Sequence, residues 1–483
     1  MSTVPDLMRI GAIQTEMAQD VQTIITDPVV FDQNTCRITL QNIGFLHSLS
    51  RITFQIEADS AVNGIGGANP NMTFPAGVGI HSLVERASLM IGGKTVCEIE
   101  DFAHFMGYKS MFIDNQINKE RESVLSGRIL NHNFVYTDSS DTDSYAYGID
   151  NGTFPVVPDA IGTAFFNATT PSSASATIIT DGIVPKDNLL VRNEPELQIA
   201  LADLFPFLRF NQLPLYMMSE QVSINLVFTR ADDKRRACRQ GVSGAGQTFN
   251  IKTGSVQLIA DYLTFDGEIM AQYASANAEM NFNYVDYRLA KRTYAADNFT
   301  KQILNVGGAG RIVNKIFCGM ANDNQGHNSI LNAYTSQDPG IVGINNQILT
   351  TNVRYNDEYL YPIDRTNPSI VFHDIVQTET MVPHITRDEY NSESGPDGGG
   401  LSIQKYNGHA VSDVANAGLR GKFFYQAHRL NRNERINSRG IELETTYSAL
   451  PALGGVLNYT QRVWIELLRT ATLRNGIFDC YYA

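Results

Sequence analysis

Apolar residues occupy every second position in several short runs along this chain of 483 residues. Within 37–40 and 50–56 these residues are Ile38, Leu40, Ile52, Phe54 and Ile56. Successive side chains of a strand point to opposite faces of its sheet, so the alternation predicts strands that each bury one face. Because helical patterns are confined to short pieces, we expect an all-β chain with a few short helices.

Two segments have the spacing of helices. In 101–126 apolar residues recur at helix-like intervals and the pattern stops before Gly127, which predicts one or two helices on the edge of a sheet. Asp266 is a good helix N-cap, and Glu268 follows in the first turn. We therefore expect a second helix of about three turns that continues through Ala276.

A Gly-Gly pair marks the clearest hairpin. In 87–91 apolar residues alternate with polar ones, Gly92-Gly93 follows, and the apolar pattern continues at Val96. A Gly-Gly pair between two such runs indicates a hairpin, because glycine adopts the positive φ angles of tight hairpin turns without steric cost. The overlapping Gly93-Lys94-Thr95 ends like a Walker A loop, but Ser88 stands where that motif needs a glycine. We expect this segment to form a turn and not a nucleotide site.

The other candidate motifs are incomplete. The glycine clusters at 64–67 and 307–310 do not complete Gly-x-Gly-x-x-Gly, and the nine histidines include no His-Glu-x-x-His. His373-Asp374 lies in an apparent strand, where neighbours point to opposite faces, so the two cannot form a catalytic pair. We assign no catalytic, cofactor-binding or metal-binding residue and expect no cofactor.

Composition narrows the possible partners and the compartment. Lys and Arg number 37 against 50 Asp and Glu, a net charge of −13, so no overall attraction to nucleic-acid phosphates is expected. The five cysteines are scattered and never form Cys-x-x-Cys, which favours a reducing compartment. Residues 1–20 do not have the pattern of a secretory signal, and no apolar run approaches the ~18 residues of a membrane span. We expect a protein that is not secreted.

A change of composition divides the chain nearly in half. Lys234-Arg235-Arg236 precede a stretch rich in Gly, Ser and Gln, which is typical of a linker. Asn42-Ile43-Gly44 in the first half has a counterpart in Asn305-Val306-Gly307 in the second, which suggests a duplicated β domain. The predicted division is an N-terminal arm over 1–25, a first domain over 26–230, a linker over 231–253 and a second domain over 254–483.

Four ordered segments resemble the double jelly-roll major capsid proteins of double-stranded DNA viruses, the group that includes virophages, polinton-like viruses and nucleocytoplasmic large DNA viruses. They are the hairpin in 83–98, the segment 204–228 with its Phe205-Pro206-Phe207, the strand 256–265 that leads into Asp266, and 299–320. They span both halves of the chain in the order and spacing of that family.

The resemblance implies two tandem eight-stranded jelly-roll β-sandwiches with short helices and with long inserted loops at about 138–181 and 322–418. It further implies a structural major capsid protein whose homotrimer is a pseudo-hexameric capsomer of an icosahedral shell enclosing double-stranded DNA. The expected partners are copies of the chain, neighbouring capsomers, penton proteins and minor capsid or cement proteins, with no small-molecule substrate. The expected location is the virion, assembled inside the host cell.

Two basic clusters leave two interpretations open. They are Arg230, Lys234, Arg235, Arg236 and Arg239 in the linker, and Arg429, Arg432, Arg435 and Arg439 near the C-terminus. Interleaved acids such as Asp232 and Glu434 fit a solvated, salt-bridged surface. The alternative is contact with the genome, an internal membrane or a minor capsid protein on the inner side of a shell. The N-terminal stretch has apolar residues near helical spacing but is too short to fold alone. In the family that the chain resembles, the N-terminal arm lies under the capsomer, which implies an arm here that orders on a neighbour; simple disorder is the alternative.

A double jelly-roll hydrolase acting on glycans or glycopeptides is the alternative function, because a fold by itself does not settle activity. That reaction needs two carboxylates converging in a cleft, whereas the candidate acids Asp357, Glu358, Asp388 and Glu389 fall in predicted loops. A carbohydrate-binding module would need exposed aromatic side chains. The single tryptophan, Trp464, lies among apolar neighbours and is expected in the core.

Overall fold

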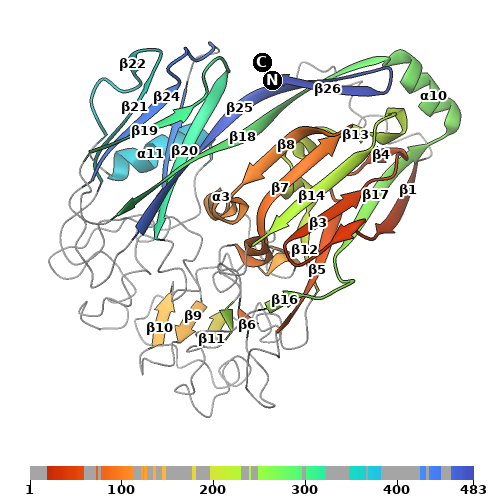
Figure 1. Ribbon diagram of the computed structural model, residues 1–483, viewed down its shortest axis with the longest axis horizontal. Helices are drawn as coiled ribbons and strands as arrows, with labels where there is room; N and C mark the ends of the chain where they lie inside the picture. Colours follow the sequence, from red (N-terminus) through yellow and green to blue (C-terminus); the bar gives the residue numbers. More distant parts are fainter. Residues whose placement is uncertain are drawn as a thin grey trace.

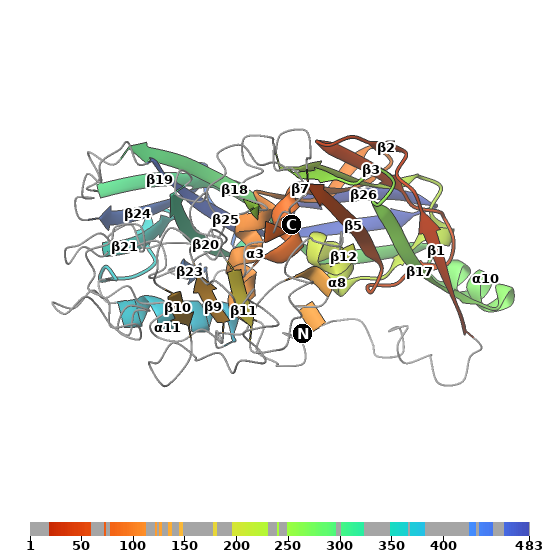
Figure 2. The ribbon, with the colours of Figure 1, turned by 90° about the horizontal axis from the view of Figure 1, so that it is seen from below.

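The computed structural model places two β-sandwich units side by side, referred to below as the first and second rolls (Figure 1 and Figure 2). The residues that it describes are 19–58, 72–73, 78–112, 121–122, 125–127, 134–137, 144–147, 177–180, 196–229, 239–240, 249–295, 301–322, 348–365, 368–381, 425–430, 434–447 and 458–482.

The first roll consists of two antiparallel sheets. One has the strand order β2 (Val30–Phe31), β3 (Thr35–Thr39), β14 (Val222–Phe228), β7 (Val84–Ile91) and β8 (Lys94–Glu100). The other has the order β12 (Glu196–Ala200), β5 (Arg51–Ala58), β17 (Gln257–Phe265), β4 (Phe45–Leu46) and β13 (Leu213–Pro214). To this second sheet β1 (Gln19–Thr26) adds at β17, and β16 (Phe249–Ile251) adds at β5.

The second roll also has two antiparallel sheets. One has the order β18 (Glu279–Ala295), β25 (Asn458–Arg474), β20 (Val313–Asn322) and β23 (Tyr425–Arg429), with β26 (Ile477–Tyr482) paired to β25. The other has the order β19 (Lys301–Gly307), β24 (Ile441–Tyr447), β21 (Ile348–Tyr355) and β22 (Glu358–Tyr359). The long strands β18 and β25 pair over their whole length and extend from the second roll across to the first (Figure 1).

Short helices and two small sheets complete the described structure. The helices are η2 (Gly79–Leu83), α3 (Phe102–Lys109), η3 (Ser110–Phe112), α7 (Leu201–Leu204), α8 (Pro206–Phe210), η4 (Leu215–Met217), α10 (Gly267–Ala276) and α11 (Pro368–Glu379). The small sheets are β10 (Ser144–Tyr147), β9 (Phe134–Thr137) and β11 (Thr177–Thr180), and β15 (Arg239–Gln240) with β6 (Met72–Thr73).

The period-two pattern is confirmed where it was clearest. In β3 the side chains of Cys36 and Ile38 are buried while Arg37 between them is exposed. The predicted hairpin is β7 and β8, and its two turn residues, Gly92 and Gly93, have φ angles of 57° and 81°. The expected strand-to-strand turn is therefore present: Gly93 of the Walker-like motif lies in it, and Lys94 and Thr95 begin β8.

The two helical predictions had different outcomes. The Asp266 carboxylate accepts a hydrogen bond from the Glu268 amide at 3.2 Å, and α10 ends at Ala276 as predicted. The other segment gives the short helix α3, which lies between the rolls and not on the edge of a sheet (Figure 1). Residues Phe102 to Tyr108 of α3 are all buried, because the second roll covers the side of the helix that the first roll leaves open.

The sheets do not follow the domain bounds that the sequence suggested. Strand β17 was assigned to the second domain, but it pairs with β1, β4 and β5 in the first roll. Strand β16, placed in the linker, also pairs with β5. Residues 19–25 of the predicted arm belong to β1, an ordered strand of the first roll. Local composition did not reveal these pairings because the partners lie about 200 residues apart in the chain.

The predicted insertion at about 322–418 contains part of the second roll itself. Strand β21 pairs with β24 along 348–355, and α11 lies beside β23. The pattern was missed because the buried positions of β21 include Thr351 and Asn352, which hydrogen-bond to Gln426 and Asp364 at 3.0 and 2.7 Å. The predicted strand at His373-Asp374 is wrong, since both residues lie in α11. Two short strands, β10 and β11, occur within the other predicted insertion.

One hydrophobic core runs through the first roll and into the second. It contains Phe54 and Ile224 of the first roll together with Phe317 and Trp464 of the second. A smaller core lies within the second roll. Strand β25 serves both, because its odd positions Val463, Ile465 and Leu467 belong to the smaller core while Trp464 belongs to the larger.

Candidate functional site

Aromatic rings join α3 of the first roll to the sheet of the second. The Phe105 ring centroid lies 4.8 Å from that of Tyr287 on β18 and 6.2 Å from that of Trp464 on β25, both edge-on. Tyr108 stacks on Phe317 of β20, with centroids 4.2 Å apart and planes at 9°. All five rings are buried, so the junction between the rolls is part of the core and is expected to be rigid.

A charged cluster lies beside these rings. The Lys315 ammonium is 2.6 Å from Oε2 of Glu379 and 3.3 Å from Oε2 of Glu466. The hydroxyl groups of Tyr108 and Tyr287 donate to the same carboxylates at 2.7 and 2.8 Å. The cluster therefore connects α3 to α11 and to the three neighbouring strands of the second roll, with every charge paired.

The protonation states of this cluster follow from its pairing. Burial acts to raise the pKa of Glu379, but the ammonium groups of Lys109 and Lys315 outweigh it and hold the pKa below its usual value. Burial acts to lower the pKa of Lys315, but Glu466 and Glu379 raise it above the usual value. Both groups are therefore charged near neutral pH. A glycosidase acid requires the opposite, a carboxyl group whose pKa is raised so that it holds a proton.

A cavity of about 260 Å³ opens beside the charged cluster, between α3, α7 and α8 of the first roll and the strands of the second. The Lys109 ammonium at its wall lies 3.9 Å from Glu379 and within 5.4 to 5.7 Å of four aromatic ring centroids. The charged residues of the lining are Lys109, Arg209, Lys315, Asp203, Glu379 and Glu466. Three bases balance three acids, so the cavity favours neither a cationic nor an anionic ligand.

A second ion network ties the start of α3 to β25. The Arg462 guanidinium donates to Asp101 at 2.7 Å, and Nδ1 of His104 lies 2.6 Å from the other oxygen of that carboxylate. Burial acts to raise the pKa of Asp101, but Arg462 and His104 hold it well below its usual range. Asp101 is thus a charged residue fixed between the two rolls.

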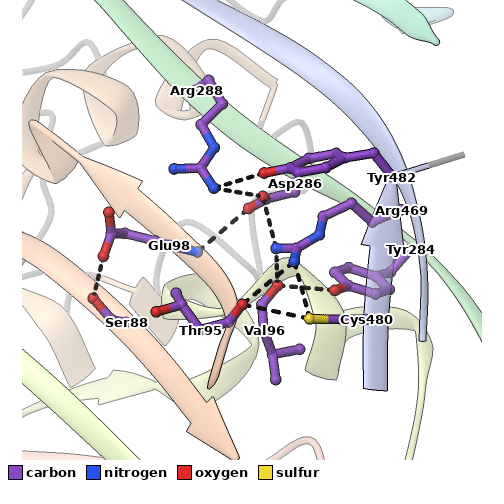
Figure 3. A network of polar contacts seen from close by, with 10 residues as sticks. All are labelled: Ser88, Thr95, Val96, Glu98, Tyr284, Asp286, Arg288, Arg469, Cys480 and Tyr482. Carbon is purple, nitrogen blue, oxygen red and sulfur yellow. Dashed lines mark hydrogen bonds and ion pairs between the residues drawn. The ribbon is translucent and has the colours of Figure 1, made fainter. Parts of the chain in front are cut away.

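A third network lies between β8 and the strands β18, β25 and β26 (Figure 3). The Arg469 guanidinium is 3.1 Å from Oδ2 of Asp286, and Arg288 is 3.7 Å from the same oxygen. Arg288 also donates to the Tyr482 hydroxyl at 2.7 Å. Burial raises the pKa of Asp286 despite the two guanidinium groups. The three networks together place buried charge at three points of the junction, around Lys315, Asp101 and Asp286.

The acids considered for a hydrolase do not converge in the described structure. Asp357 is exposed and pairs with Arg439, and Glu358 is exposed in β22. Asp388 and Glu389 lie outside the described residues. His373 is exposed and contacts Gln377, while Asp374 pairs with Arg365 at 3.1 Å.

The basic clusters are described only in part. Residues 230–238 lie outside the described structure, as do Arg432 and residues 1–18 of the predicted arm. Arg429, Arg435 and Arg439 are exposed, and Arg439 is paired with Asp357. This pair fits the salt-bridged interpretation at one position.

Sequence reasoning missed the charged residues of the junction. Arg462, Glu466 and Arg469 lie in a strand whose apolar positions were recognised, and all three are buried. A signal was present, since Arg462, Trp464 and Glu466 alternate with Val463, Ile465 and Leu467. Charged residues in a strand normally indicate a solvent-exposed face, whereas here that face is covered by the first roll.

Metal-site, membrane-helix and cysteine features of the described residues bear on other functions. No cluster of three or more His, Cys, Asp or Glu that could hold a metal ion occurs among them. No helix in the described part of the chain is long and apolar enough to cross a membrane. The four described cysteines, Cys36, Cys97, Cys318 and Cys480, are free thiols.

Comparison with solved structures identifies the fold. The Sputnik virophage structure matches with a TM-score of 0.54 and 14% identity, covering 97% of this chain and 89% of that one. The Faustovirus major capsid protein matches with a TM-score of 0.53 and 10% identity, covering 94% and 90%. This chain has the double jelly-roll fold of viral major capsid proteins. A chain of the PBCV-1 virus capsid matches with a TM-score of 0.52 and 11% identity, covering 97% of both chains.

The double jelly-roll fold is thus shared over nearly the whole chain at very low identity. No protein-family model matches the sequence, and no curated protein matches it. The predicted all-β class with two jelly-roll sandwiches is confirmed, and so is the resemblance on which it was based.

Proposed function

We propose that this chain is a structural capsid subunit that trimerises into a pseudo-hexameric capsomer, and that such capsomers tile an icosahedral shell around double-stranded DNA. The observation that supports this most directly is the whole-chain match: both rolls together, and not one roll alone, align with capsid chains over 97% of each. A likeness confined to one sandwich would fit many functions of that common fold.

The architecture suits such a tile. Three chains around a three-fold axis contribute two similar rolls each, so six similar units surround the axis, as a pseudo-hexameric capsomer requires. The rolls share a core across the junction, so the two rolls of one chain can keep a fixed orientation within the capsomer. Subunit contacts that are individually modest suffice in a closed shell, because each tile is held on several sides at once.

The partners and location follow from this proposal. We expect copies of the chain, neighbouring capsomers, penton proteins and minor capsid or cement proteins, in a virion assembled inside the host cell. The basic clusters are proposed to give weak contacts to the genome or to an internal membrane on the inner face. Residues 1–18 are proposed to form an arm that orders on a neighbouring subunit; their deletion should leave trimers intact and impair higher assembly.

The native mass of the purified chain tests the central claim. Light scattering after gel filtration should give three times the 53.4 kDa of the chain, and negative-stain images of that peak should show a pseudo-hexagonal outline. A monomer that persists across protein and salt concentrations would contradict the trimer.

The hydrolase alternative has a separate test. Glu379 and Glu466 are the two carboxylates that converge on one group, Lys315, and both pair with its ammonium, at 2.6 and 3.3 Å. Incubation with a panel of glycans and glycopeptides should therefore yield no product. Turnover that is abolished by Glu379→Gln or Glu466→Gln would replace the capsid proposal with an enzymatic one.

A further inference from the structure

A lysine amine that no described residue holds by a hydrogen bond lies at the wall of the cavity between the rolls. The Nζ of Lys109 is 3.9 Å from Oε2 of Glu379, which is too far for a hydrogen bond. The same carboxylate oxygen is 2.6 Å from the Nζ of Lys315, which lines the same cavity and also reaches Glu466 at 3.3 Å. Of the two lysines in the described lining, Lys315 is therefore held by carboxylates and Lys109 is not.

The surroundings of Lys109 favour its neutral form more than water does. Four aromatic ring centroids lie within 5.4 to 5.7 Å of its Nζ and exclude water from it. Burial is the main cause that lowers the pKa of Lys109; the cations of Lys315 and Arg209 act in the same direction, while two nearby carboxylates oppose them. A desolvated lysine with a lowered pKa is an activated nucleophile, because its lone pair is free in a larger fraction of the molecules.

A reaction that removes the charge of Lys109 would leave no carboxylate of the cluster without a cation. Glu379 would keep Lys315 at 2.6 Å and the hydrogen bond from the Tyr108 hydroxyl at 2.7 Å. Lys315, by contrast, is the cation that Glu379 and Glu466 share, and the two carboxylates raise its pKa. The pairing therefore permits covalent chemistry at Lys109 and opposes it at Lys315.

The cavity limits the size and polarity of a molecule that could reach this amine. Its volume of about 260 Å³ is below the about 300–1,000 Å³ of pockets for drug-sized ligands, so it suits a molecule of about one ring. The three acids and three bases of its lining balance, so a neutral molecule fits better than an ion. The apolar part of the lining, which would contact a ring, consists of Phe105, Met106, Ala202, Pro206 and Val285.

We propose that Lys109 is a covalent binding site for a small, neutral aromatic aldehyde, which enters this cavity and forms an imine with the lysine amine. The nitrogen lone pair attacks the carbonyl carbon and forms a C–N bond, while the electrons of the C=O π bond move to the oxygen. The two amine protons pass to that oxygen, the C–O bond breaks, and one water molecule leaves as the C=N bond forms. No oxidant or reductant is needed. The site goes beyond the proposed capsid function, which requires no small molecule.

Reductive labelling of the purified full-length chain tests this site. Benzaldehyde is the probe, sodium cyanoborohydride traps each imine as a benzylamine, and peptide mass spectrometry measures the labelled fraction of each lysine. Lys94 is the internal control, because its side chain is 44% exposed against 20% for Lys109, while a hydrogen bond to Asp479 raises its pKa. Near neutral pH, initial labelling of Lys109 is expected to be roughly tenfold faster than that of Lys94. Labelling that follows exposure, with Lys94 as fast as Lys109 or faster, would overturn the proposal.

A substitution separates the contribution of the cavity from that of the amine. Ala202→Phe places a ring in the cavity and keeps Lys109, and Ala274→Phe in α10 is the matched control, since both alanines are half-buried in helices. Ala202→Phe is expected to reduce the labelling of Lys109 to the rate of Lys94, whereas Ala274→Phe should leave it unchanged. Equal labelling of Lys109 in the two variants would show that the aldehyde does not use the cavity, and the proposal would be wrong.

A bulkier aldehyde gives the same comparison on the wild-type chain, in case Ala202→Phe does not fold. Pyrenecarboxaldehyde has four fused rings and is too large for a cavity that suits about one ring. It should label Lys94 ahead of Lys109. Preference for Lys109 with this probe as well would contradict selection by the cavity. Because the two lysines are compared within the same particle, these outcomes do not depend on whether that particle is a trimer.

Discussion

Arg462 and Asp101 are 361 residues apart in the chain, and their side chains form a 2.7 Å ion pair across the junction of the two rolls. Asp101 is also the residue before α3 and has a φ angle of 54°. Its carboxylate therefore connects Arg462 of the second roll to His104 in the first turn of a buried helix.

Arg462→Met should be strongly destabilising. It leaves the Asp101 carboxylate buried without its main cation, and loss of one partner of a buried pair costs about 3–5 kcal/mol. The free energy of unfolding, measured in urea, checks this. Arg474→Met is the control on the same strand, because Arg474 and its partner Glu279 are exposed; it should change stability by no more than about 0.5 kcal/mol. Similar losses for both variants would contradict a special role for the junction.

Lys315→Met should cost more than the double variant Lys315→Met/Glu466→Gln. The single change leaves the carboxylates of Glu379 and Glu466 near each other without the ammonium between them, which costs about 3–5 kcal/mol. The double change also removes the Glu466 charge and leaves Glu379 paired with Lys109, so part of the loss should be recovered. Chemical unfolding of the two variants under the same conditions measures the difference. A double variant less stable than the single one would show that these charges are not coupled.

Acid should weaken the junction. The pKa values of Glu379 and Asp101 are lowered in the folded protein, so their contribution to stability is present above the unfolded pKa and is lost as pH falls through the folded one. Unfolding free energies measured below about pH 4.5 should fall with pH. Glu379→Gln should flatten that fall by up to about 1.4 kcal/mol per pH unit. Parallel curves for wild type and variant would contradict the assigned pKa shift.

Gly44→Ala should destabilise the first roll more than Gly93→Ala. Both glycines have positive φ, 51° and 81°, so both changes cost about 1–2 kcal/mol in backbone strain. A Cβ at position 44 would also lie 2.4 Å from the carbonyl oxygen of Leu263, whereas at position 93 it meets nothing within 4 Å. Thermal unfolding should show the larger decrease in Tm for Gly44→Ala. Equal decreases would mean that β17 can move away from this turn.

Trp464 provides a direct optical probe of the junction, since it is the only tryptophan of the chain. Its side chain is 1% exposed and stacks on Phe317 with centroids 5.4 Å apart. The native protein should emit at shorter wavelength than the unfolded chain, and iodide should quench it weakly. Arg462→Met is expected to increase iodide quenching before global unfolding. Strong quenching of native wild-type protein would contradict the packing of the rolls described above.

Much of the fold could be predicted from the sequence because its signals are local. Apolar residues at every second position in 37–40 and 50–56 correctly predicted strands of the first roll. Gly92-Gly93 correctly predicted a hairpin, and Asp266 the start of a helix. The ordered resemblance supplied the double jelly-roll architecture. Strand β21 was missed because its buried Thr351 and Asn352 are polar, and they are stable there only through partners elsewhere in the chain.

Local signals in the sequence predict a protein built of strands with a few short helices, because the alternation of apolar residues, the turn residues and the helix caps act over a few neighbouring residues. The pairing of β17 in the first roll, the position of α3 between the rolls and the burial of Arg462, Glu466 and Arg469 follow from the tertiary packing. Whether a charged residue is buried depends on distant segments that supply opposite charges and cover it. Pairing over hundreds of residues leaves no local pattern in the sequence, so the junction that unites the two rolls becomes visible only once they are packed together.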